Sequence, residues 1–82
     1  MSEIMMQRGR LAECRQRRRH ADAVLRGQID QLRILLDPIS GPDAIDPERF
    51  MALAMEFSAK LADYKALVRE ISTIERILGS VA

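Results

Sequence analysis

Two heptad series of mostly apolar residues, separated by a segment rich in proline, glycine and aspartate, restrict what this 82-residue chain can fold into. The first series consists of Ile4, Leu11, Arg18, Leu25 and Leu32, and the second of Phe50, Phe57, Tyr64, Ile71 and Leu78. Further apolar residues follow three or four positions after members of each series, which is the pattern of an apolar stripe along an α-helix. The sequence therefore predicts an all-α fold in which two long helices pack antiparallel as a hairpin.

The first helix is expected over about residues 3–36. Ser2 is a suitable N-cap for it. Pro38 disfavours the helical conformation in the residue before it, so the helix should stop there. Residues 37–46 are then the loop, and we expect its apolar residues, Ile39 among them, to pack over the tip of the hairpin.

The start of the second helix has clear local signals. Asp46 is placed to accept a hydrogen bond from a first-turn amide, and Pro47 suits the first helical position. Glu48 complements the positive end of the helix dipole. Ile45 and Phe50 have the spacing of a hydrophobic staple across this cap. These signals predict that the helix begins at residue 47.

The second helix is predicted over about residues 47–78, with Gly79 as its C-terminal cap. Each helix is then about 50 Å long at 1.5 Å per residue, and the matched lengths favour a hairpin. If the chain reverses near residue 41, facing residues have numbers that add to about 85. Cys14 then faces Ile71, and the two apolar series are in register.

The apolar arc of the second helix is wider than one partner helix can cover. We expect the apolar residues of the second helix to form an interaction interface, which consists of Phe50, Met51, Leu53, Met55, Phe57, Leu61, Tyr64, Leu67, Ile71, Ile74 and Leu78. A single hairpin of this size buries a small fraction of its surface, so we expect a homodimer that forms a four-helix bundle. A higher oligomer, a complex with a different protein at the apolar stripe, and a marginally stable monomer remain alternatives.

A cluster of arginines forms the main charged feature. Residues 1–20 hold six arginines against two glutamates, a net charge of +4, although the whole chain carries only +1. The proposed basic patch consists of Arg15, Arg17, Arg18 and Arg19. Arg18 also occupies a heptad position, where it is expected to lie along Tyr64 or Val68, near enough to Asp63 to pair, and to help fix the register and the oligomeric state.

The alternative function is that of a nucleic-acid-associated accessory protein, in which a dimer presents Arg15 to Arg19 to phosphates. The near-zero net charge, the absence of aromatic residues among the arginines and the absence of helix-turn-helix spacing count against it.

Catalysis and metal binding have little support in the sequence. Cys14 and His20 are six positions apart with no second Cys or His, so no metal ligand set is expected. The helical carboxylates Glu56, Asp63 and Glu70 recur every seven residues. Neighbouring members are therefore about 10 Å apart along the helix, too far for a catalytic dyad. We expect a non-enzymatic protein with no cofactor and no small-molecule substrate.

The sequence also supports predictions of cellular location, domain organisation and function. One cysteine allows no intrachain disulfide, no signal peptide is recognisable, and no apolar run reaches the length of a membrane span. These features predict a single domain over residues 1–82 in the cytoplasm, not attached to a membrane. The predicted function is protein–protein association, by self-assembly or as an adaptor for a partner.

Overall fold

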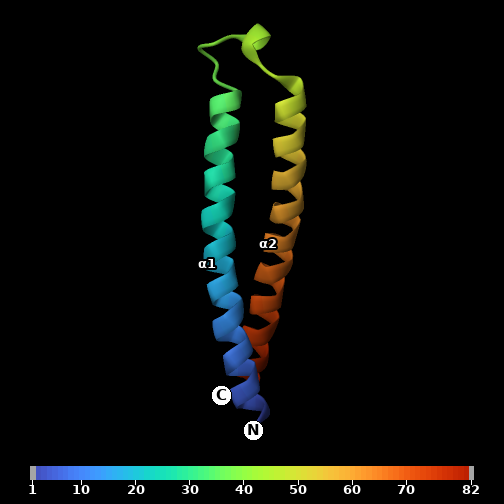
Figure 1. The fold of residues 1–82 in the computed structure, drawn as a ribbon. Coiled ribbons are helices and arrows are strands. Elements are labelled where there is room, and N and C mark those ends of the chain that lie inside the picture. The colour runs from blue at the N-terminus through green and yellow to red at the C-terminus, as the bar shows by residue number, and fades with distance from the viewer. Residues whose placement is uncertain (1, 82) are drawn as a thin grey trace.

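A computed structural model describes the backbone of residues 2–81 and the side chains of residues 2–80. It contains α1 (Glu3–Leu35), a short 3-10 helix η1 (Pro42–Ala44) and α2 (Pro47–Val81). The two long helices run in opposite directions and are joined by the loop at one end, so both termini lie at the other end (Figure 1). The predicted all-α antiparallel hairpin is confirmed.

Local hydrogen bonds explain where α1 begins and ends. The Ser2 hydroxyl accepts a hydrogen bond from the amide of Met5 at 3.2 Å, which confirms the predicted N-cap. At the other end the amide of Leu36 donates to the carbonyl of Leu32 at 3.0 Å, and the chain then leaves the helix. α1 thus ends one residue earlier than predicted, which still agrees with the restriction that Pro38 imposes.

The loop is held by its own hydrogen bonds. The Asp37 carboxylate accepts from the amide of Ile39 at 3.1 Å and from the hydroxyl of Ser40 at 3.3 Å. Gly41 has φ of 82°, and a Cβ there would also lie 3.3 Å from Asp43 Oδ1, so the turn requires glycine. Ile39 is 93% exposed, because these polar contacts shape the turn and leave its side chain pointing to solvent. The prediction that Ile39 packs over the tip is therefore wrong.

α2 starts as its sequence indicates and ends later. Asp46 Oδ1 accepts hydrogen bonds from the amides of Glu48 and Arg49, at 3.1 and 3.2 Å. The predicted C-terminal cap at Gly79 is wrong, since this residue lies inside α2. The helical penalty of one glycine, about 1 kcal/mol relative to alanine, does not end the helix here. The hydroxyl of Ser80 donates to the carbonyl of Ile77 at 2.9 Å, within the continuing helix.

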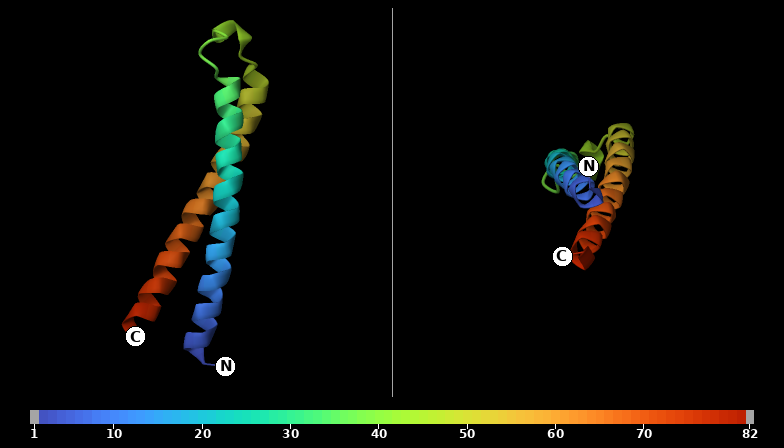
Figure 2. Two further views of the ribbon diagram at one scale, coloured as in Figure 1. Left: turned by 90° about the vertical axis from the view of Figure 1, so that its left-hand side faces the viewer. Right: turned by 90° about the horizontal axis from the view of Figure 1, so that it is seen from below.

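The hairpin is long and thin. Its principal extents are 59, 18 and 17 Å, and its radius of gyration is 18.3 Å, against about 12 Å for a compact domain of this length. The helices lie side by side in one view and diverge toward the termini in the perpendicular view, so their axes cross at an angle (Figures 1 and 2). A shape of this kind leaves much of each helix without a packing partner.

Candidate interaction surface

The centre of the hairpin core lies toward the open end. The buried cluster consists of Leu11, Cys14, Ile71 and Ile74, with the partly buried Leu67 and Leu78 packed against it. This composition agrees with the predicted register, in which Cys14 faces Ile71. Apart from this cluster, Leu25 is the one buried apolar residue among the described side chains, with 6% of its surface exposed. The core that a single hairpin builds for itself is therefore small.

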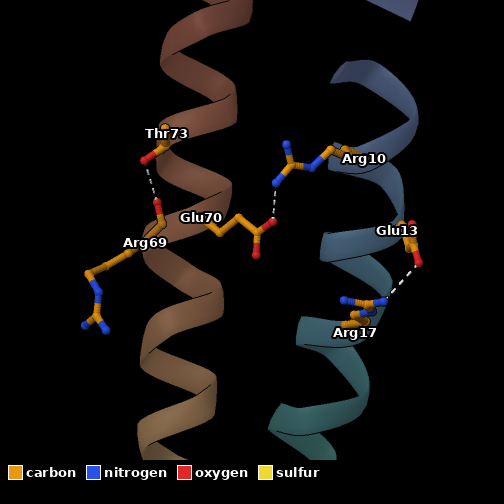
Figure 3. Close-up of polar contacts among 6 residues, drawn as sticks. All are labelled: Arg10, Glu13, Arg17, Arg69, Glu70 and Thr73. Atoms are coloured by element: carbon orange, nitrogen blue, oxygen red, sulfur yellow. Dashed lines mark hydrogen bonds and ion pairs between the residues drawn. The ribbon is translucent and has the colours of Figure 1, made fainter. Parts of the chain in front are cut away.

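Two ion pairs join the helices around this cluster. Arg10 Nη2 lies 2.8 Å from Glu70 Oε1, and Arg15 Nη2 lies 3.7 Å from Glu75 Oε2. Figure 3 shows the Glu70 side chain reaching from α2 toward Arg10 on α1. The hydrogen bond from Arg10 lowers the pKa of Glu70 below its ordinary value of 4.5. Because these side chains are largely exposed, the pairs define the register of the helices more than they stabilise the fold.

Cys14 is buried among the apolar residues of the seam, with 4% of its surface exposed. Burial raises the pKa of its thiol, and the negative charge of Glu70 raises it further. A buried thiol that is disfavoured as thiolate is a packing residue and a poor nucleophile. Among the described residues no group of three or more His, Cys, Asp and Glu side chains is arranged to hold a metal ion.

Gln28 is the buried polar residue of the seam, and sequence analysis missed it. Its side chain is 7% exposed, and its Oε1 has no hydrogen-bond partner in the described part of the chain. Arg18 was expected to be the polar residue at a core position, but its side chain is exposed, and none of the ion pairs within residues 2–80 joins it to Asp63. The heptad pattern would have pointed to Gln28, which lies three positions after Leu25 just as Cys14 lies three positions after Leu11.

Most of the predicted interface residues lie in the seam between α1 and α2. Ile71 and Ile74 are buried, and the half-buried members are Phe50, Leu53, Phe57, Leu61, Tyr64, Leu67 and Leu78. Met51 and Met55 differ from these, with 60% and 69% of their surfaces exposed. The seam residues are thus largely covered by α1, and the two methionines mark a second, outward surface of α2.

This second surface is a charge-free stripe, which we call the α2 stripe. Its members are Met51, Met55, Ser58, Ala59, Ala62 and Ala66, and all of them are exposed. Helical geometry places residues with these spacings on one side of the helix. The stripe extends over about 22 Å at 1.5 Å per residue. Its alanines and serine allow another helix to approach closely, and its two methionines are adaptable apolar contacts.

Exposed apolar side chains also gather at both ends of the hairpin. Those near the loop are Ile29, Ile34, Leu36 and Ile39, and those near the open end are Ile4, Met5, Met6 and Ile77. A groove of about 480 Å³ near the loop is lined mainly by apolar residues, including Ile29, Leu36 and Phe57. The apolar surface left uncovered therefore extends along the whole molecule.

The predicted basic patch is partly neutralised. Arg17 Nη2 lies 3.1 Å from Glu13 Oε1 on the same helix, and Figure 3 draws this ion pair. Arg15 pairs with Glu75 of α2. Arg18 and Arg19 are exposed. The four arginines point in different directions around α1, so they do not form one continuous surface for a phosphate backbone.

A groove between the helices brings several polar side chains together. It has a volume of about 310 Å³, and Arg17, His20, Lys60, Asp63 and Tyr64 contribute to its lining. It is open to solvent, since only two helices enclose it.

Neither α1 nor α2, as far as the structure describes them, combines the length and the apolar character needed to cross a membrane. No protein-family model, curated protein or solved structure matches the chain.

Proposed function

We propose that this chain is a non-enzymatic protein that acts through protein–protein association, and that two copies pack through the α2 stripe, with the two α2 helices adjacent at the centre and each α1 on the outside. The observation that carries this proposal is the stripe itself. About four turns of α2 present exposed, uncharged side chains, although α2 has charged residues on its other sides. Solvated helix faces are normally charged or polar, so a stripe of this kind is suited to packing against another helix.

The area of the surface supports the same conclusion. The hairpin exposes 6470 Å², whereas a compact monomer of 9.3 kDa exposes about 5,000 Å². The excess of about 1,500 Å² exceeds the roughly 800 Å² that each partner buries in a standard interface. A second hairpin that covers about 800 Å² of each chain would lower the exposed surface per chain to about 5,700 Å², closer to that of compact proteins.

Association through the stripe is better supported than phosphate binding. Arg15 and Arg17, two members of the basic patch, already have carboxylate partners, and the net charge of the chain is +1. The long-range attraction that nucleic-acid binding requires is therefore weak.

Two alanine substitutions test the proposal. Ala62 lies in the stripe and Ala23 lies on α1 outside it, and both are exposed helical alanines. Ala62→Glu places a carboxylate in the proposed interface and is expected to make the protein monomeric. Ala23→Glu makes the same chemical change elsewhere and is expected to leave the dimer intact.

The measurements are sedimentation equilibrium for mass and circular dichroism for helix content, each on both variants. Equal helix content with a monomer for Ala62→Glu and a dimer for Ala23→Glu supports the proposal. If both variants keep the mass of the unsubstituted chain, the stripe is not the interface and the proposal is wrong.

A further inference from the structure

We propose that the two hairpins of the dimer are antiparallel, centred near Ser58 and Ala59, so that the acidic loop end of each lies beside the arginine-rich end of the other. This inference rests on the proposed self-association through the α2 stripe. It adds the orientation and the register, which two independent features of the hairpin indicate.

The first feature is the distribution of side-chain size along the stripe. Met51 and Met55 lie at one end of it, and Ala62 and Ala66 lie at the other. In an antiparallel pair each methionine faces an alanine of the second copy, so large and small side chains alternate and the gap is filled evenly. In a parallel pair methionine would face methionine at one end and alanine would face alanine at the other, and the helices would diverge.

The second feature is the distribution of charge along the hairpin. The open half, residues 1–20 with 66–82, has eight arginines and four glutamates, a net charge of +4. The loop half, residues 21–65, has five basic and eight acidic side chains, a net charge of −3. The hairpin is 59 Å long, several times the screening length of about 8 Å at physiological salt, so each end responds to what lies next to it.

The alignment of the two copies that the side-chain sizes indicate also brings opposite charges together. When Met51 faces Ala66 of the second copy, residue 48 of the acidic segment reaches the level of Arg69 of that copy. Arg69 and Arg76 continue the side of α2 that carries the stripe. The acidic loop end of each hairpin therefore approaches these two arginines of the second copy. A parallel dimer would instead place the two loop halves, each with a net charge of −3, side by side. It would do the same with the two open halves, each with a net charge of +4.

Distances between spin labels measure the orientation directly. One label is attached through Ala44→Cys in the loop and, in a separate variant, through Asp63→Cys beside the stripe on α2; both sites are exposed. Labelling takes place in native buffer, where the buried Cys14 is protected, and the unsubstituted chain treated in the same way gives the background. An antiparallel dimer places the two loops about 45 Å apart, whereas the Asp63 labels lie within roughly 30 Å, because the two α2 helices are adjacent.

The outcomes separate this inference from the proposed function. A long distance from the loop with a short distance from Asp63 supports the antiparallel dimer. Loop labels within roughly 30 Å of each other indicate a parallel dimer, which overturns the orientation and leaves self-association standing. An absence of any distance between copies, together with a monomer mass, overturns both.

A charge reversal gives a second, independent readout. Asp43 is exposed in the acidic loop, and Asp43→Lys is expected to weaken an antiparallel dimer by roughly two- to five-fold, because it faces arginines. In a parallel dimer the same substitution relieves repulsion and strengthens association. A tighter dimer, with unchanged helix content, would therefore overturn the antiparallel arrangement.

Discussion

Replacing Gln28 with leucine is expected to stabilise the hairpin. The side chain is 7% exposed in the seam, and its Oε1 has no hydrogen-bond partner within residues 2–80. A buried polar group left without a partner costs about 1–3 kcal/mol. Leucine has a similar size and no polar atom, so Gln28→Leu should raise the free energy of unfolding by about that amount. For a domain of this length, each 1 kcal/mol corresponds to about 4–8 °C in Tm.

Urea unfolding followed by circular dichroism measures this change. All variants are compared at one protein concentration, because the stability of a self-associating protein depends on it. Gln16→Leu is the matched control, since Gln16 is exposed on α1 and its replacement should change stability by no more than about 0.5 kcal/mol. A loss of stability in Gln28→Leu would refute the reasoning, because it would mean that Gln28 is hydrogen-bonded in solution.

Two further predictions concern the ion pair between the helices and the start of α2. Arg10 lowers the pKa of Glu70 below 4.5, so the stability that this carboxylate contributes is fully present above pH 4.5 and is lost as the pH falls through the lowered value. The difference in unfolding free energy between the unsubstituted chain and Glu70→Gln should therefore shrink below pH 4.5, and a difference that grows there would contradict the assignment. Asp46→Ala removes the acceptor for two amides at the start of α2 and should cost about 0.5–2 kcal/mol in the same urea assay. Asp30→Ala, at an exposed carboxylate of α1 away from this cap, serves as its control, and an equal loss in both variants would show that the cap is not the cause.

The parts of the fold that depend on local chemistry were predictable from the sequence. The caps at Ser2 and Asp46 are confirmed because a short side chain bonds amides within three residues of itself. The register of Cys14 and Ile71 is confirmed because two long apolar stripes joined by a short loop have few ways to match.

Apolar character alone was a poor guide to which residues enter the seam. Ile29 lies four positions after Leu25 and fits the apolar pattern of the first helix, yet Ile29 is exposed and Gln28 is buried. The geometry of the helix decides this, since a spacing of three from Leu25 keeps position 28 facing α2. The side chain at that position is buried whether it is polar or not.

Features that depend on contacts between residues far apart in the sequence could not be predicted from the sequence. The spacing of Glu70 from Glu56 and Asp63 does not indicate a partner for it, but Glu70 pairs with Arg10 across the hairpin. The α2 stripe was recognised only through Met51 and Met55, because alanine and serine carry little hydrophobic signal. Their exposure shows that this side of α2 lacks both a partner within the hairpin and the charges of a solvated surface.

The mass of the unsubstituted chain in solution tests the central claim most directly. Sedimentation equilibrium at micromolar concentration, with helix content measured on the same sample, is the appropriate experiment. Self-association through the α2 stripe predicts a mass twice the 9.3 kDa of one chain. A mass of 9.3 kDa with intact helices would contradict it.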